Sequence, residues 1–154
     1  MTMTVIPSAD LRPARAGDLP AIERLLTDAG LPVAGVAEML ETFTVATSGT
    51  DLVGVAGLEL CHDNALLRSV AVLPEWRSRG LGRRLVTHVV ADAEARGFRA
   101  LYLLTTTAER YFPSFGFRQI TRDAVPADIR ETEEFVSACP ASATVMERRL
   151  GAIR

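Results

Sequence analysis

Arg77-Ser78-Arg79-Gly80-Leu81-Gly82 separates two apolar segments of this 154-residue chain. Before it, Ala65–Leu73 has the composition of a strand, and after it, Arg83–Arg96 has the amphipathic pattern of a helix. A helix that begins directly after a glycine turn leaves its first backbone N–H groups without acceptors, at the positive end of the helix dipole. Such groups bind anions. The sequence therefore predicts a strand, an anion-binding loop and a helix, in that order.

The loop suits a diphosphate. Glycine at 80 and 82 lets a pyrophosphate approach the backbone closely, because no Cβ stands in the way. A dinucleotide fold needs a third glycine three residues after the second, and position 85 is Leu85. A Walker loop needs a lysine, and all 17 basic residues of the chain are arginine. Both of these nucleotide patterns are thus excluded.

The remaining pattern is R-x-x-G-x-G, and it follows the strand-like segment S-V-A-V-L-P-E-W at Ser69–Trp76. Together they resemble the GNAT superfamily of acyl-CoA-dependent N-acetyltransferases, over roughly Leu11–Leu150. The resemblance implies acetyl-CoA (coenzyme A) as the donor. It places the cofactor against Val70, Val72, Arg77, Ser78, Arg79, Gly80, Leu81, Gly82 and Arg83.

Length and composition favour one compact domain at residues 11–150 after a tail at residues 1–10. The net charge of −2 gives no footprint for nucleic acid, and no apolar run is long enough for a membrane span. Cys61 and Cys139 are far apart and lie in no C-x-x-C pattern, so we expect reduced thiols and no metal site. The N-terminus lacks the features of a signal peptide, and we expect a cytoplasmic protein.

Strand and helix signals alternate along the chain. Helices are expected over Leu19–Ala29, Val33–Glu41, Arg83–Arg96 and Thr107–Ser114. Strands are expected over Leu11–Arg15, Thr42–Thr47, Leu52–Leu60, Ala65–Leu73, Ala100–Thr105, Phe117–Thr121 and Ala143–Leu150. The order matches a GNAT fold, of mixed α/β (α+β) class. The resemblance implies a central, mostly antiparallel sheet, flanked by helices and splayed between strands 4 and 5.

Acetyl transfer requires stabilisation of an oxyanion and a proton for the departing thiolate. The resemblance gives the first role to the backbone N–H of Val70, and it lets Val72 bond the pantetheine arm. Many members carry a tyrosine acid four residues before a Gly-Phe pair, but here that position is Phe112. Tyr111, one residue earlier, is the alternative acid; water, or departure of the thiolate without an acid, would also serve.

The general base is also open. The family position of a glutamate base is occupied by Leu66. Glu59, near the end of the third strand, could draw a proton from the amine through a water. His62 has the better intrinsic pKa, but it belongs to a turn that is expected to be exposed.

The acceptor side rests on Arg68 and on the long segment Val125–Ser142. Arg68, two residues before Val70, is expected on the same strand face, and with Arg130 and Ser142 it could clamp a carboxylate. Such a clamp suits an amino-acid-like small-molecule amine.

Three segments carry a finer resemblance: L-R-S-V-A-V, L-L-T-T-T-A-E, and P-x-x-I-R-x-T-x-E-F with C-P-x-S. All three resemble the arsenic-resistance-associated acetyltransferases, and the first two also resemble N-acetylglutamate synthases of the short form. A non-catalytic acyl-CoA-binding sensor stays open because Phe112 and Leu66 occupy the usual places. Members of the family often form homodimers, but no feature of this sequence fixes an interface.

Overall fold

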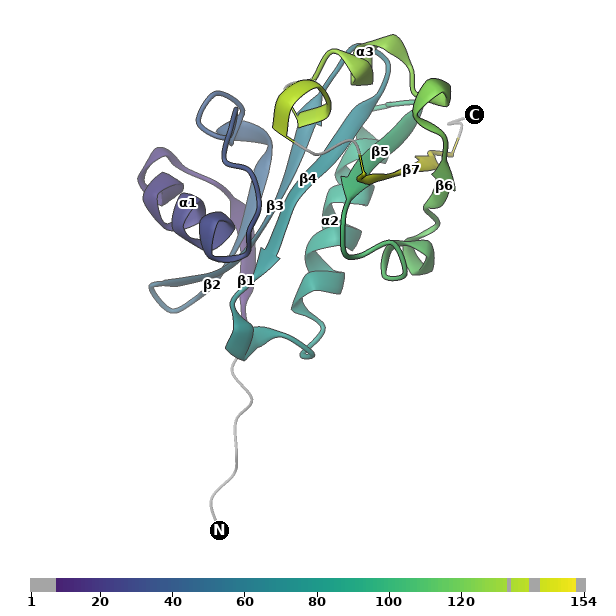
Figure 1. The fold of residues 1–154 in the computed structure, drawn as a ribbon. Coiled ribbons are helices and arrows are strands. Elements are labelled where there is room, and N and C mark those ends of the chain that lie inside the picture. The colour runs from purple at the N-terminus through teal and green to yellow at the C-terminus, as the bar shows by residue number, and fades with distance from the viewer. Residues whose placement is uncertain (1–7, 133, 139–141, 152–154) are drawn as a thin grey trace.

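The computed structural model describes residues 8–132, 134–138 and 142–151 (Figure 1). Within these residues one sheet has the strand order β1-β2-β3-β4-β5-β7-β6. Its strands are β1 (Asp10–Pro13), β2 (Phe43–Ser48), β3 (Asp51–Leu60), β4 (Ala65–Val72), β5 (Ala100–Thr105), β6 (Arg118–Ile120) and β7 (Thr144–Arg149). The helices are α1 (Leu19–Asp28), α2 (Leu81–Ala95) and the short α3 (Ala127–Arg130).

The sheet is mixed and mostly antiparallel, as predicted. Neighbouring strands run antiparallel at every pairing except that of β4 with β5. The predicted fold class is confirmed.

In the described part of the chain, no helix is both long and apolar enough to cross a membrane.

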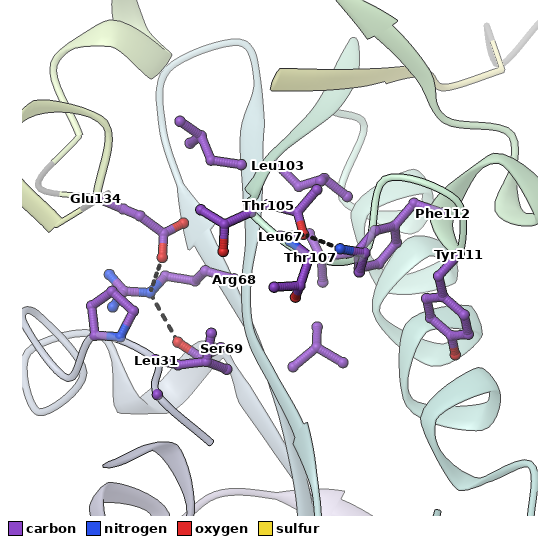
Figure 2. Close-up of a pocket in the computed structure, with 16 residues that line it drawn as sticks. Leu31, Leu67, Arg68, Ser69, Leu103, Thr105, Thr107, Tyr111, Phe112 and Glu134 are labelled. Carbon is purple, nitrogen blue, oxygen red and sulfur yellow. Dashed lines mark hydrogen bonds and ion pairs between the residues drawn. The ribbon is translucent and has the colours of Figure 1, made fainter. Parts of the chain in front are cut away.

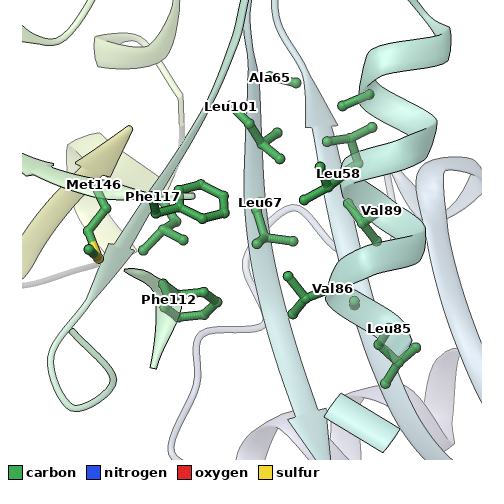
Figure 3. Packing of buried hydrophobic residues seen from close by; sticks show 14 of the residues in the cluster. Leu58, Ala65, Leu67, Leu85, Val86, Val89, Leu101, Phe112, Phe117 and Met146 are labelled. Atoms are coloured by element: carbon green, nitrogen blue, oxygen red, sulfur yellow. The ribbon is translucent and has the colours of Figure 1, made fainter. Parts of the chain in front are cut away.

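Helices cover both faces of the sheet (Figure 1). On one face, Leu85, Val86 and Val89 of α2 pack against β3, β4 and β5 (Figure 3). On the other face, Ile22, Leu25 and Leu26 of α1 pack against β2 and β3. The i, i+3 and i+4 spacing of these apolar residues gives each helix one buried side. Strand β4 thus lies between the α1 layer and the α2 layer, and the glycine loop joins its end to the start of α2.

Strands β4 and β5 part after two residue pairs. Ala65 lies opposite Leu101 and Leu66 opposite Tyr102, and the pairing stops there. Strand β5 continues against β7 over its full length, whereas β4 continues against β3. The two strands therefore follow different partners, which produces the splay that the resemblance implies.

A β-bulge interrupts β4 at the same place. Val55 lies opposite Ala71 and Gly57 opposite Arg68, so Ser69 and Val70 together face the single residue Ala56. Ser69 has a φ of 60°, which is uncommon for a residue with a side chain. Bulges of this kind redirect side chains and occur next to active sites.

The bulge overturns one prediction. Regular alternation would place Arg68 and Val70 on the same face, but the extra residue reverses the alternation. Val70 packs against the cluster on the α2 side, whereas Arg68 donates to the carbonyl of Ala34 on the α1 side. Arg68 therefore lies across the sheet from the side chain of Val70.

Two helix predictions were also wrong in extent. In the expected helix Val33–Glu41, residues 34–39 form turns and only the 3-10 helix Leu40–Thr42 is helical, because Gly35 at a φ of 81° breaks the helix. The helix expected at Thr107–Ser114 is a 3-10 turn over Phe112–Phe115. Pro113 accounts for its late start, since a proline lacks a backbone N–H and is tolerated in the first turn of a helix but not in its interior.

Candidate active site

A cavity of about 520 Å³ opens where β4 and β5 part (Figure 2). Strand β4 contributes residues 67–70, and the end of β5 with the loop after it contributes residues 103–108. The remaining lining residues are Gly30, Leu31, Pro32, Tyr111, Phe112 and Glu134. The cavity therefore joins four segments that are distant in sequence, and we call it the wedge pocket.

The glycine loop has the geometry of an anion site. Gly80 caps α2 with a φ of 80°, and no side chain in the described part of the chain caps the N–H groups that follow it. Ser78 also has a positive φ, of 64°. A Cβ at Gly80 would meet no atom within 4 Å, so the backbone there is open. Exposed N–H groups at the start of a helix of this length attract phosphate.

The arginines of the loop are exposed. Those at 77, 79, 83 and 84 surround the start of α2. Arg79 lies over the ring of Trp76, and Arg83 lies over Phe115 while donating to Ser114. The predicted cofactor residues of this loop are thus brought together with positive charge around them.

Val72 and Tyr111 meet at the loop. The hydroxyl of Tyr111 lies 3.2 Å from the point that a Cβ on Gly82 would occupy, and Cγ2 of Val72 lies 3.9 Å from it. Burial raises the pKa of Tyr111, and Arg83 opposes this. Phe112 is buried in the core on the α2 side. Tyr111 therefore lies at the glycine-loop end of the wedge pocket, and Val70 lines its wall.

Arg68 is fully engaged inside the protein. Its side chain has 0% exposure, and Nη2 donates to the carbonyl of Ala34 at 2.7 Å. Nε donates to Ser69 Oγ at 3.1 Å, and Nη1 lies 3.3 Å from Glu59 Oε1. Because these partners already occupy its N–H groups, the guanidinium of Arg68 has few donors left for an acceptor carboxylate.

Glu134 completes this cluster from the far end of the chain. Its Oε1 lies 3.8 Å from Arg68 Nε, on the side of the wedge pocket (Figure 2). Burial raises the pKa of Glu134 to about 7; Arg68 lowers it and Glu59 adds to the rise. Sequence reasoning missed Glu134, although the segment Val125–Ser142 was recognised as long and functional in character.

Glu59, the predicted base, contacts Arg68 from another side and is not among the described residues that line the wedge pocket. His62 lies in an exposed turn, 3.9 Å from Asp63. The two carboxylates, Glu59 and Glu134, thus share one guanidinium, and only the second faces the cavity.

The structure does not assemble the predicted carboxylate clamp. Arg130 Nη2 donates to the carbonyls of Asp123 and Val125, because α3 places its side chain over that turn. Ser142 is exposed. Cys139 and Pro140 of the same motif lie outside the described residues. Neither Arg130 nor Ser142 is among the described residues lining the wedge pocket.

The raised pKa of Glu134 should make the free energy of unfolding depend on pH. Between pH 4.5 and about 7, the folded protein holds a proton on Glu134 that the unfolded chain releases, so stability falls as the pH rises through this window. Glu134→Gln cannot lose a proton. From pH 4.5 to pH 8, its free energy of unfolding should therefore rise relative to wild type by about 3 kcal/mol.

Urea unfolding of both proteins at the two pH values measures this difference. The exposed neighbour Glu131 offers a matched control, since Glu131→Gln removes a carboxylate that faces solvent. Parallel stability curves for wild type and Glu134→Gln would show that Glu134 titrates normally.

Comparison with known proteins agrees with this geometry. A family model described as an acetyltransferase (GNAT) domain matches residues 40–119. An amino-acid acetyltransferase of Neisseria meningitidis is 28% identical over 130 residues, which are 79% of this chain and 30% of that protein. The chain therefore spans less than a third of that relative. An uncharacterised N-acetyltransferase of Chlorobaculum tepidum is 29% identical over 80% of this chain and 86% of its own length.

The fold is also found among solved structures. N-acetylglutamate synthase of Neisseria gonorrhoeae, in complex with coenzyme A and N-acetyl-glutamate, superposes with a TM-score of 0.81 at 23% identity. The match covers 96% of this chain and 36% of that one. The family model spans more than half of the sequence, including the glycine loop and the splayed strands. This chain belongs to the GNAT acetyltransferase family.

Proposed function

We propose that this protein transfers the acetyl group of acetyl-CoA to the amine of a small acceptor. The observation that carries the proposal is the wedge pocket, which opens between β4 and β5 beside the anion-binding start of α2. A cavity between splayed strands admits a long, narrow thioester, while the loop holds its diphosphate. When bound, acetyl-CoA supplies an acetyl group activated as a thioester.

The residues fit this donor. The N–H groups after Gly80 and the arginines around them suit a diphosphate. Val70 lines the pocket where β4 lacks a partner on its β5 side, which supports a role for its backbone N–H toward a thioester carbonyl. A preorganised N–H donor at such a carbonyl is typically worth about 3 kcal/mol of barrier lowering.

Amino acids are the first acceptors to test. One relative is named an amino-acid acetyltransferase, and one structural neighbour contains N-acetyl-glutamate. Among the described lining residues, Arg68 is the one cation, and it is already paired. The described part of the pocket therefore holds no unpaired cation for the carboxylate of an amino acid, so an amine without a carboxylate belongs in the same panel. A link to arsenic resistance is supported by the sequence resemblance of the C-terminal segment.

The test is thiol release from acetyl-CoA in the presence of glutamate, glutamine, alanine, arginine or spermidine, with coenzyme A binding measured by calorimetry. The proposal expects release with at least one of these amines. Binding of coenzyme A without release would favour the sensor that Phe112 and Leu66 leave open. A protein that neither binds coenzyme A nor releases thiol with any of these amines would contradict the proposed function.

A further inference from the structure

We infer that Glu134 takes the proton from the acceptor amine and that Arg68 positions it for this role. The inference deepens the proposed function and rests on it, because it names the base of the same wedge pocket. It also names the acceptor class, an amine that is protonated in water.

The first observation is the position of Glu134. Glu134 is 4% exposed, yet its carboxylate belongs to the wall of the wedge pocket. Figure 2 places it across the pocket from Tyr111, with the ends of β4 and β5 between them. A buried carboxylate at that place attracts an ammonium group.

The second observation is the set of contacts that holds the guanidinium of Arg68. Its guanidinium is held by the carbonyl of Ala34, the hydroxyl of Ser69 and the carboxylate of Glu59. Ser69 belongs to the bulge of β4, so the strand that opens the wedge also fixes Arg68. Because these contacts hold it in place, Arg68 fixes Glu134 and does not itself bind the acceptor. Arg68 is therefore a positioning residue.

Proton affinity is the third argument. Two carboxylates share one buried guanidinium, so one of them can be neutralised by a proton at little electrostatic cost. Among the residues that the structure describes, the charged groups that act on Glu134 are Arg68 and Glu59, and its pKa of about 7 matches neutral pH. A base works best when its pKa lies near the operating pH. Glu59 lacks the access to the cavity that Glu134 has.

Acetyl transfer starts with the removal of a proton from the acceptor. The acceptor enters as an ammonium and gives one proton to the carboxylate of Glu134. Its freed lone pair attacks the carbonyl carbon of the thioester and forms the C–N bond, while the π pair of the carbonyl moves to oxygen. When that pair returns, the C–S bond breaks and its bonding pair goes to sulfur. The second proton of the nitrogen ends on the thiolate. Glu134 returns its own proton to water, so each turnover releases one proton.

The kinetic test compares wild type, Glu134→Gln and the matched control Glu131→Gln over pH 5.5–9. With an amine from the panel, wild-type kcat/KM should fall below about pH 7, as Glu134 becomes protonated. Glu134→Gln should lose about 10²-fold in kcat/KM at pH 7.5 and should lack this limb. Coenzyme A should bind all three proteins equally, which shows that the fold and donor site are intact.

Retention of the pH limb by Glu134→Gln, or of kcat/KM within about twofold, would overturn the inference while leaving the proposed function standing. Failure of wild type itself to bind coenzyme A or to turn over would sink the proposed function instead.

A second readout needs no acceptor. In protein labelled with ¹³C at glutamate carboxyls, the signal lost in Glu134→Gln should titrate near pH 7 in wild type. A signal titrating near 4.5 would overturn the inference, because such a carboxylate has no reason to take up a proton at neutral pH.

Discussion

Arg68→Met is expected to lower the free energy of unfolding by about 3 kcal/mol at pH 8. The substitution keeps a long apolar stem but leaves Glu59 and Glu134 without their shared guanidinium. Breaking a buried ion pair in this way is costly, because each carboxylate loses its partner and gains no water. The carbonyl of Ala34 loses its donor as well.

Urea unfolding at pH 8 measures the loss, with Arg110→Met as the control on an exposed arginine. Adding Glu134→Gln to Arg68→Met should restore part of the stability, since one of the two stranded charges is then gone. The account of the cluster is contradicted if Arg68→Met is as stable as Arg110→Met, or if the double variant is no more stable than the single one.

Gly80→Val is expected to weaken coenzyme A binding by about 10²-fold, equivalent to about 2.8 kcal/mol. Gly80 caps α2 at a φ of 80°, where a β-branched residue is strained. Valine would relax toward negative φ and turn the following N–H groups away from the diphosphate. Since those groups and the arginines around them form the predicted phosphate site, binding should suffer more than stability.

Gly97 supplies a matched control for this experiment. It stands near the other end of α2 with a φ of 83°, and a Cβ there would also meet no atom within 4 Å. Gly97→Val therefore carries the same backbone strain without touching the loop. Calorimetry with coenzyme A should find wild-type affinity in Gly97→Val. Equal affinities for the two variants would show that the loop does not hold the donor.

Much of the fold could be predicted from the sequence, because local signals are strong where elements are regular. The apolar run Ala100–Thr105 became β5 with the same bounds, and Gly97 follows the helix that it was predicted to end. The backbone of the loop Arg77–Gly82 and the helix start after it could be predicted because glycine spacing reports directly on backbone conformation. The splay itself followed from the family resemblance.

The acceptor side could not be predicted to the same depth. The bulge at Ser69 adds one residue to β4, and no period in the sequence signals it, so Arg68 was assigned to the wrong face. Glu134 reaches Arg68 from a segment 66 positions later in the chain, and only tertiary packing brings them together. Arg130 was a reasonable candidate by type, but its neighbours' carbonyls occupy it.

The most direct test of the central claim follows the acetyl group itself. Wild-type protein is mixed with acetyl-CoA labelled in its acetyl carbons and with each amine of the panel, and the products are identified by mass spectrometry. The account predicts labelled acetyl on the nitrogen of at least one amine, strongly reduced by Glu134→Gln. Label that stays in acetyl-CoA, or that leaves only as free acetate, would contradict it.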